Sequence, residues 1–362
     1  MKKKVLVIFV TILLLNSLII SQNKNREKSN QKEENVTFVS FPDFFNFDVP
    51  QPWPRWDKAV NYFLNQVEIE QPDFVAIAGD LVDGRWTDSP ECIEQNGTLY
   101  YSDWKQRMKK HDLKYYTAIG DHELGDDPWK KDKLKLNPHF ERVYDNLLDM
   151  PENGPEGKKG LAYYVRKGDL LFITVETFQV VGDSMRCSVF GEQLEWFKKV
   201  LQKHKDAKFK VVQGHIPIWG NPSARSSSKL MLDKGKDSKF YKTMIKYGTD
   251  LYLCGEFHDV TISESEGLWQ IVHGASWGRK IVSTEDYLVA NMENNNLNLE
   301  MKRIYKDASG GHMWNVNKPR GPREIVEINS KTLQNGPEII GEITINKKNG
   351  KKKYLNRSGV FK

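Results

Sequence analysis

The sequence predicts an α/β fold, because short apolar runs typical of buried strands alternate with segments of helical periodicity. The chain has 362 residues, 39% of them hydrophobic, which is enough to bury one large core or two smaller ones. Five of the apolar runs lead to a carboxylate or a histidine. These strand ends connect the predicted fold to a predicted chemistry.

The helical segments lie between the strand-type runs, where they are expected to cover the faces of a sheet. In the first segment, Ala59, Phe63 and Val67 recur at helical spacing. Two β-type runs on either side of Lys167-Gly168-Asp169 predict a tight hairpin. The predicted helices are Trp56–Val67, Tyr100–Lys110, Glu192–His204 and Lys239–Tyr247, and the hairpin joins Leu161–Arg166 to Leu170–Thr174.

Beyond Gly278 the pattern favours strands alone. Tyr287–Met292 and Leu297–Ile304 predict paired strands, Asn315–Arg323 predicts a loop, and Glu338–Tyr354 predicts a hairpin that turns at Asn349-Gly350. We interpret 279–362 as a small β-rich C-terminal extension.

The five strand ends share one layout, in which a buried run leads to a side chain that can bind a metal ion. A glycine precedes this side chain in four of the five, so the backbone can turn sharply and approach a bound ion. One Gly-Asp pair after a strand is more often an ordinary turn. Because open α/β sheets bind ligands beyond the carboxyl ends of their strands, five such ends together predict metal-assisted phosphoester hydrolysis. In chain order they are Asp43, Gly79-Asp80, Gly120-Asp121-His122-Glu123, Gly214-His215 and Gly255-Glu256-Phe257-His258.

In these motifs the chain resembles the calcineurin-like metallophosphoesterase superfamily, over about Val36 to Ser276. The family pattern runs Asp-x-His, Gly-Asp-x-x-Asp, Gly-Asn-His-Asp/Glu, Gly-His and Gly-His-x-His. Gly79-Asp80-Leu81-Val82-Asp83 and Gly214-His215 keep this pattern. The resemblance implies a two-sheet β-sandwich flanked by helices around a dinuclear metal centre.

Three motifs depart from the family, and most of the changes introduce a carboxylate. Phe41 stands where the family has the aspartate of its first motif, and Asp43 stands in place of the histidine. Asp121 replaces the asparagine, and Glu256 replaces the first histidine of the last motif. A decaying pseudoenzyme would more plausibly show Ala, Ser or Leu, so we interpret this chain as a carboxylate-rich variant.

The resemblance implies two metal ions that share one bridging carboxylate. Hard oxygen donors favour Mg, Mn, Ca or Fe, and of these we predict Mn or Fe as the two divalent or mixed-valence ions, with Mg possible. The two retained histidines also keep Zn possible. Four carboxylates formally balance two divalent ions, so we expect weaker acidification of bound water and a more alkaline pH optimum than in a histidine-rich relative. The implied ligands are Asp43, Asp80 and His258 for one ion and Asp80, Asp121, His215 and Glu256 for the other.

The mechanism implied by the resemblance uses a metal-bound hydroxide as nucleophile and His122 as the general acid. Glu123 is expected to orient the His122 imidazole, and Asp83 to support the site without binding metal. The alternative for His122 is a solvent-facing loop histidine. Arg225, beside a run of serines, either binds the substrate phosphate or belongs to a polar surface loop. His273 either contacts substrate or is a structural histidine.

Two long loops are expected beside the site, and we predict that they select the substrate. The first is rich in aromatic and proline residues, and its rings either cap the core or stack on a sugar or base. The second is predicted over Gly84–Leu99. The aromatic residues of the first loop are Phe44, Phe45, Phe47, Trp53 and Trp56.

The N-terminus has the layout of an export signal, because Lys2-Lys3-Lys4 precede the apolar stretch Val5–Ile20. We predict a signal peptide or an uncleaved membrane anchor over 1–21 and a disordered tether over 22–35. The metallophosphoesterase domain is then 36–278, in an exported protein that is periplasmic or secreted and is tethered to a membrane if the anchor is retained.

Three cysteines are too few for a disulfide framework, although one bridge between Cys92 and Cys187 would suit an exported protein. The formal net charge of +6 is contributed partly by both tails, so no specific nucleic-acid partner is predicted. The predicted partner is a phosphoester substrate. Because the metal charge is neutralised, diesters are favoured over dianionic monoesters. The alternatives are a catalytically inactive binding module of the same fold and a calcium-stabilised adhesion module.

Overall fold

The computed structural model describes residues 35–45, 49, 54–86, 89–220, 229–274, 284–309, 325–349 and 351–362. Residues 35–362 form one compact unit. The predicted signal or anchor, 1–21, and nearly all of the predicted tether lie outside the described residues. Within the described ranges, no helix is both long and apolar enough to cross a membrane.

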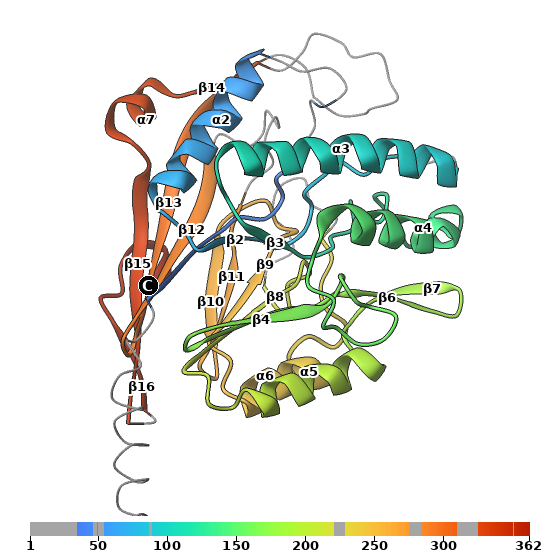
Figure 1. Ribbon diagram of the computed structural model, residues 1–362. Helices are drawn as coiled ribbons and strands as arrows, with labels where there is room; N and C mark the ends of the chain where they lie inside the picture. The colour runs from blue at the N-terminus through green and yellow to red at the C-terminus, as the bar shows by residue number, and fades with distance from the viewer. Residues whose placement is uncertain are drawn as a thin grey trace, which may run out of the picture. The chain divides into compact units, whose positions relative to one another are not determined.

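Two large sheets form the centre of this unit, and they confirm the predicted two-sheet fold (Figure 1). The first sheet has the order β16-β15-β13-β12-β1-β2-β3, with β14 paired to β13, and the second has the order β10-β11-β9-β8-β5-β4. The strands of the first sheet are β1 (Val36–Ser40), β2 (Phe74–Ile77), β3 (Tyr115–Thr117), β12 (Thr284–Glu293), β13 (Asn296–Ser309), β14 (Ile325–Ile328), β15 (Glu338–Lys348) and β16 (Lys351–Leu355). Those of the second are β4 (Tyr163–Lys167), β5 (Leu170–Thr174), β8 (Phe209–Gln213), β9 (Leu251–Cys254), β10 (Thr261–Ser265) and β11 (Leu268–Val272).

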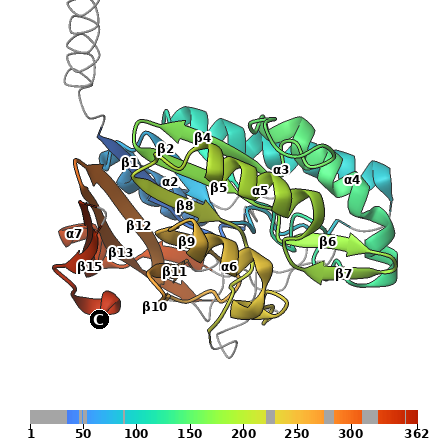
Figure 2. The same cartoon turned by 90° about the horizontal axis from the view of Figure 1, so that it is seen from below.

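Helices cover the outer side of each sheet, as Figures 1 and 2 show. On the first sheet, Phe63 of α2 contacts Tyr287 of β12 at a ring-centroid distance of 5.7 Å. On the second sheet, Phe240 of α6 contacts Phe197 of α5 at 5.2 Å and Tyr252 of β9 at 5.9 Å. The helices are α2 (Pro54–Ile69), α3 (Pro90–Lys110), α4 (Lys131–Leu148), α5 (Gly191–Lys203), α6 (Lys239–Lys246) and α7 (Ser330–Asn335).

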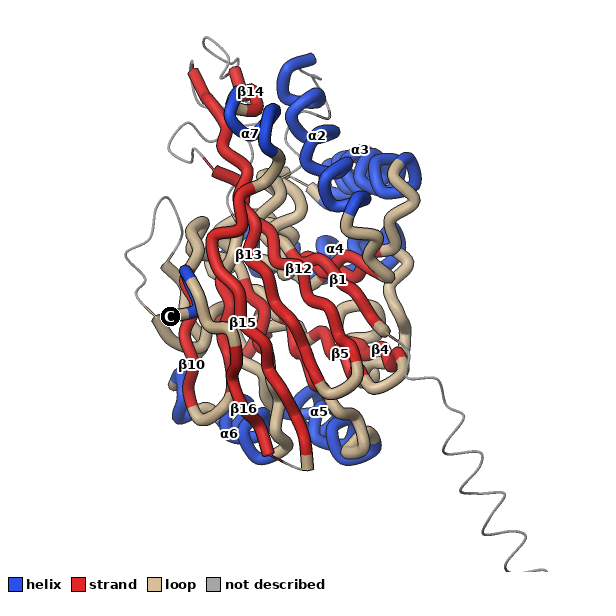
Figure 3. Tube along the Cα trace, turned by 90° about the vertical axis from the view of Figure 1, so that its left-hand side faces the viewer, coloured by secondary structure: helices blue, strands red, loops and turns tan. Residues whose placement is uncertain are grey.

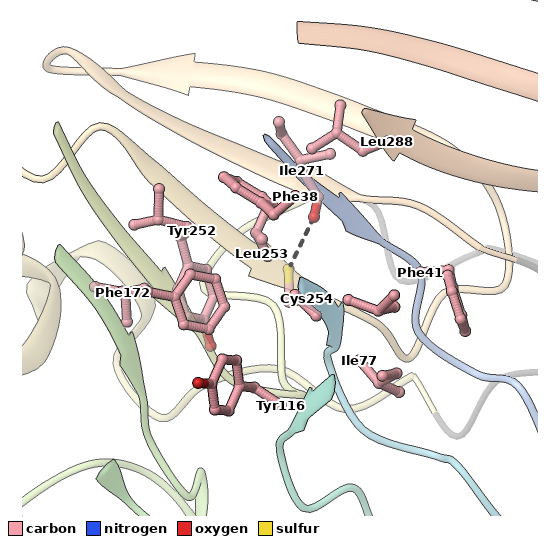
Figure 4. Close-up of a cluster of buried hydrophobic side chains, with 14 of the residues drawn as sticks. Phe38, Phe41, Ile77, Tyr116, Phe172, Tyr252, Leu253, Cys254, Ile271 and Leu288 are labelled. Atoms are coloured by element: carbon pink, nitrogen blue, oxygen red, sulfur yellow. Dashed lines mark hydrogen bonds between the residues drawn. The ribbon is translucent and has the colours of Figure 1, made fainter. Parts of the chain in front are cut away.

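Aromatic and aliphatic side chains from both sheets meet in the core between them (Figure 4). The Phe172 ring of β5 lies 5.9 Å from Phe38 of β1 and 5.1 Å from Phe74 of β2, both edge to face. Strands β5, β8, β9 and β11 are buried along their whole length. This burial on both faces explains why these strands are largely apolar, with only Thr174, Lys210, Gln213 and Gln270 as polar residues.

Parallel pairing brings the predicted strand ends to one edge of the two sheets. Strands β1, β2 and β3 are parallel in the first sheet, and β5, β8, β9 and β11 are parallel in the second. Because parallel strands end on the same side, the segments that follow β1, β2, β3, β8 and β9 leave together. We call this side the catalytic edge.

Most predicted elements are confirmed, but several were missed, among them β10, β14 and α7, and one loop is wrong. Helix α4 and the separate hairpin of β6 (Phe178–Val181) and β7 (Ser184–Cys187) were not predicted. The predicted excursion over Gly84–Leu99 is half helical, because α3 begins at Pro90. Ser89 caps α3 by accepting a hydrogen bond from the Cys92 amide, a start signal visible in the sequence.

All three cysteines are free, so the predicted bridge between Cys92 and Cys187 is wrong. Cys92 lies in the first turn of α3, whereas Cys187 ends β7 in a different part of the fold.

The C-terminal strands continue the first sheet. β12 pairs with β1 along five residues, and β13, β15 and β16 extend the sheet from there (Figure 3). The paired strands and the closing hairpin are therefore confirmed, whereas the predicted loop Asn315–Arg323 and the boundary near residue 278 lie outside the described residues.

One buried carboxylate joins the C-terminal hairpin to the second sheet. Asp250, which is fully buried before β9, accepts from Lys347 Nζ at 2.6 Å and lies 2.8 Å from Lys352 Nζ. The backbone amide of Lys210 also donates to it, at 2.9 Å. We expect Asp250→Ala to lower the free energy of unfolding by roughly 3–5 kcal/mol, because it leaves buried lysine charge without a partner.

Thermal or denaturant unfolding measures this loss. Asp206→Ala is the matched control, because its side chain is 74% exposed and surface changes usually stay within about 0.5 kcal/mol. Equal stability of the two variants would contradict a structural role for Asp250.

Candidate metal centre

The catalytic edge gathers carboxylates and imidazoles into one buried cluster around His215. The Nε2 atom of His215 lies 3.3 Å from Asp121 Oδ1, 3.5 Å from Asp80 Oδ1 and 3.7 Å from Glu256 Oε2. Nearby, His258 Nε2 lies 3.7 Å from Asp43 Oδ1. Side chains that follow five different strands therefore converge, as the strand ends predicted.

Two glycines make this convergence sterically possible. A Cβ on Gly79, whose φ is +90°, would lie 2.5 Å from His215 Nδ1, and a Cβ on Gly120 would lie 2.1 Å from Asp80 Oδ1. Any larger residue would push the histidine or the aspartate away.

Four residues of the cluster have a strained, left-handed backbone conformation. Left-handed φ values, which L-residues adopt at a cost of order 1–3 kcal/mol each, are concentrated here. Such strain persists only where the surrounding structure holds it, and it is typical of functional sites. The residues are Asp43 (+52°), Asp80 (+57°), Glu256 (+73°) and His258 (+52°).

The Nε2 atom of His215 faces the carboxylates. Its Nδ1 lies 2.9 Å from the Ala78 carbonyl oxygen, which can only accept, so Nδ1 carries a proton. Burial opposes a charge on the ring, but Asp80, Asp121 and Glu256 together raise the pKa of His215 well above its usual range, so Nε2 favours a proton or a metal ion between itself and these carboxylates. A backbone carbonyl behind the ring is the usual support of a metal-ligating histidine.

Burial makes the carboxylates costly unless cations balance them. Asp43, Asp80, Asp121 and Glu256 are at most 2% exposed. Burial raises the pKa of Asp43 to about 7 and that of Asp80 well above its usual range, although His215 opposes both shifts. Within the described residues, Asp43 Oδ2, both Asp121 carboxylate oxygens and His215 Nε2 make no hydrogen bond. These atoms could bind a metal ion.

The candidate ligands form two overlapping groups, each with ligand atoms within 4.8 Å of one another: Asp43, Asp80 and His215, and Asp121, His215 and Glu256. The second group contains three of the four ligands predicted for one ion and lacks Asp80. In the first group His215 stands where His258 was expected, and His258 instead lies beside Asp43. The predicted assignment of each ligand to one of two ions stays a prediction.

Comparison with known proteins now identifies the family. The sequence pattern of the calcineurin-like phosphoesterase family matches residues 48–260, more than half of the chain. The chain belongs to the calcineurin-like phosphoesterase family. Of the six predicted ligands, Asp43 alone precedes the matched stretch. A comparison with curated proteins finds no match.

Solved structures related to this calcineurin-like phosphoesterase share little sequence with it. GAP50, the anchor in the inner membrane complex of Plasmodium, is 14% identical over 80% of this chain and 89% of its own, with a TM-score of 0.47. A dimetal phosphatase from Danio rerio is 12% identical over 82% and 99%, also with a TM-score of 0.47. A putative 5'-nucleotidase from Staphylococcus aureus is 16% identical over 72% and 51%, with a TM-score of 0.40.

His122 lies in the cluster, but Glu123 does not orient it. The His122 Nδ1 donates to the Asp83 backbone carbonyl at 2.6 Å. The Glu123 carboxylate instead accepts the amides of Gly120 at 2.7 Å, Asp80 at 2.8 Å and Val82 at 3.1 Å. The predicted role of Glu123 is therefore wrong, because backbone amides at the ends of β2 and β3 compete for its oxygens. Glu123 holds these two ligand-bearing loops together.

Asp126 is a site residue that the sequence analysis missed. Its Oδ1 lies 3.8 Å from His122 Nε2, its Oδ2 accepts from Arg85 Nε at 2.5 Å, and it groups with Asp121 and His122. The pair Asp126-Asp127 directly follows Gly125 and adopts left-handed φ values. That Gly-Asp-Asp turn, close to the third motif, was the available signal.

The aromatic loop after β1 caps the core where it is described. Phe41 packs on Phe63 of α2 at 4.9 Å, which explains why the family's aspartate position is apolar here. Phe45, which is fully buried, contacts His122 at 4.6 Å and His258 at 5.6 Å. Among the described rings of this loop, the core-capping alternative is confirmed, and Phe45 also shields the two imidazoles from water.

Of the two predicted substrate contacts, the structure describes only His273, and it does not support a contact there. His273 is fully buried, its Nε2 lies 2.9 Å from Ser40 Oγ, and burial lowers its pKa to about 4. It is therefore a neutral structural histidine, because its ring nitrogens already have partners inside the protein. Arg225 lies outside the described residues.

The buried carboxylates predict an unusual pH dependence of stability in the metal-free protein. Raised pKa values mean that the folded state binds more protons than the unfolded state between about pH 4 and 7. The free energy of unfolding should therefore fall, by on the order of a few kcal/mol, as pH rises through that window. Bound metal should reverse this trend, because cations replace the protons.

Thermal unfolding between pH 5 and 8, with chelator and with added Mn²⁺, measures both effects. Two results would contradict a metal site at these carboxylates. One is a metal-free protein that becomes more stable from pH 5 to pH 8, and the other is equal stabilisation by Mn²⁺ at pH 5 and pH 8.

Proposed function

We propose that this metallophosphoesterase hydrolyses a phosphodiester or phosphomonoester with a dinuclear metal centre at the catalytic edge. The observation that supports the proposal is the buried group of four carboxylates around His215 Nε2. Isolated buried charges are too costly to keep without partners, so bound cations would stabilise this arrangement.

The residues that would hold the ions are those that converge on the cluster. The oxygen-rich set favours Mn or Fe, and the two histidines also suit Zn. When bound, the ions would supply Lewis-acid chemistry, by polarising the phosphoryl group and acidifying water. The proposed ligands are Asp43, Asp80, Asp121, His215, Glu256 and His258.

Residues of the chain itself handle the proton of the leaving group. Since His122 Nδ1 donates to the Asp83 carbonyl, its Nε2 carries a proton only in the imidazolium form. Asp80 Oδ2 lies 3.9 Å and Asp126 Oδ1 lies 3.8 Å from this Nε2. The imidazolium can then donate to the departing oxygen from Nε2 as a general acid.

The substrate class follows from the charge of the centre. Four carboxylates formally neutralise two divalent ions, so the attraction for a dianionic monoester is weaker than at a histidine-rich centre. This balance favours diesters.

Export is also part of the proposal. It is supported by the sequence Lys2-Lys3-Lys4 followed by Val5–Ile20. Fractionation of cells that express the full chain tests it.

A panel of phosphodiesters, phosphomonoesters and nucleotides, each with Mn, Fe, Mg or Zn, tests the catalytic proposal. Turnover with about two ions per chain supports it. Metal binding without turnover of any substrate favours the inactive binding module, and binding of calcium alone favours the adhesion module.

A further inference from the structure

The β15–β16 hairpin is a strongly basic ribbon. It carries five lysines, of which Lys348, Lys351 and Lys353 are exposed, while Lys347 and Lys352 turn inward to Asp250. The exposed carboxylates Glu338 and Glu342 lie in the first half of β15, away from these lysines. At the tip, 347–353, one buried carboxylate therefore opposes five cations.

The neighbouring β12–β13 turn adds a single exposed carboxylate, Glu293. The tip of the hairpin thus keeps an excess of positive charge at the surface.

Strand pairing shows that this tip projects beyond the point where the chain enters the fold. Val36 at the start of β1 pairs with Met292, Met292 pairs with Leu297, and Leu297 pairs with Ile345, so the four form one row across the sheet. The hairpin thus lies roughly 15 Å from Val36, and it extends about 10 Å past the row. Figure 3 shows β16 at the end of the first sheet opposite β14.

The catalytic edge lies at the other end of the same strands. Asp43 follows the carboxyl end of β1, whereas the hairpin tip lies beyond its amino end. A large partner bound at the hairpin would therefore leave the metal cluster accessible.

The sequence before Asn35 indicates what this basic end meets. It contains Lys2-Lys3-Lys4 and the apolar stretch Val5–Ile20, and a polar segment of 14 residues, 22–35, connects that stretch to β1. This inference rests on the apolar segment being retained as the membrane anchor that the sequence predicts. A basic surface close to such an anchor can bind the anionic headgroups of the same bilayer. Each lysine near an anionic bilayer surface adds to binding.

We propose that the β15–β16 hairpin binds the anionic surface of a phospholipid membrane and turns the catalytic edge away from it. This inference is independent of the catalytic proposal, because none of the hairpin lysines belongs to the metal cluster. A basic ribbon can also bind nucleic acid, and the test below distinguishes nucleic-acid binding from membrane binding.

The test places a reporter on the hairpin of the full chain. In a Cys92→Ser, Cys187→Ser background, Asn349→Cys carries a fluorophore, and the protein is reconstituted in vesicles that contain a headgroup-labelled quencher lipid. We expect quenching in vesicles that contain phosphatidylglycerol, loss of quenching at about 0.5 M salt, and little quenching in pure phosphatidylcholine.

Charge reversal supplies the matched comparison. The triple variant K348E, K351E and K353E should lower quenching to the level of phosphatidylcholine vesicles. The control K130E, K131E and K135E, at the start of α4, should keep it.

Quenching that is absent in anionic vesicles, or unchanged by salt and by the hairpin variant, would overturn the proposal. The proposal would also be overturned if the protein bound a DNA duplex and the hairpin variant abolished this binding but kept the vesicle quenching. The control variant would keep both. The salt dependence is measured on the protein with its hairpin lysines unchanged, so the test does not depend on folding of the triple variant.

Discussion

Replacing Asp80 by Asn should lower kcat/KM for a phosphoester on the order of 10³-fold and reduce the bound metal below two ions per chain. Asp80 contributes to the group with Asp43 and His215, and its Oδ1 lies 3.5 Å from His215 Nε2. Asparagine keeps the shape of the side chain but removes the negative charge that two cations would share. Metal analysis and steady-state kinetics on the same preparation measure both effects.

Unfolding must be excluded as the cause of this loss. Because Asp80 is a buried carboxylate with a raised pKa, Asp80→Asn should leave the metal-free protein at least as stable as before at pH 8. Asp237→Asn makes the same chemical change at a side chain that is 90% exposed and should alter neither activity nor metal content. Full activity of Asp80→Asn would show that the cluster is not the metal centre.

Replacing His122 by Asn should lower kcat by roughly 10²–10⁴-fold for an alkyl phosphoester, whose leaving oxygen needs a proton. A nitrophenyl ester, whose leaving group departs without protonation, should be hydrolysed with a much smaller loss. This contrast is expected because His122 Nε2 faces the cluster at 3.9 Å from Asp80, while its Nδ1 is held by the Asp83 carbonyl. Kinetics with a series of leaving groups measures it.

Metal content distinguishes this role from a structural one. His122→Asn should keep the metal content of the unmodified protein, since no predicted ligand changes. His139→Asn on α4 is the control histidine and should behave normally with every ester. An equal loss for good and poor leaving groups would assign His122 to substrate positioning and not to proton transfer.

Local patterns predicted much of the fold because the signals lie within a few residues of one another. The runs that became β5, β8 and β9 needed no long-range information, since strands buried on both faces are largely apolar. Helix α4 was missed although Phe140, Val143, Tyr144 and Leu148 recur at helical spacing and are buried. Pro138 inside that helix obscured the pattern.

The roles of neighbouring side chains were less predictable. Glu123 is next to His122 in the chain, yet its carboxylate accepts hydrogen bonds from three backbone amides in two loops. His273 appeared beside a strand end, yet its ring is occupied by the Ser40 hydroxyl. In both cases the deciding partner is distant in the sequence, and adjacency along the chain gave no information about it.

The sequence by itself determined the strand ends, the glycines that allow close approach and the carboxylate-rich character of the cluster. These follow from residue type and local spacing, which parallel strands convert into convergence at one edge. Only the tertiary structure decided that His215 stands among Asp80, Asp121 and Glu256, and that Asp126 faces His122. Such distances depend on how two sheets and their loops pack, and packing is fixed by contacts between residues that are far apart in the chain.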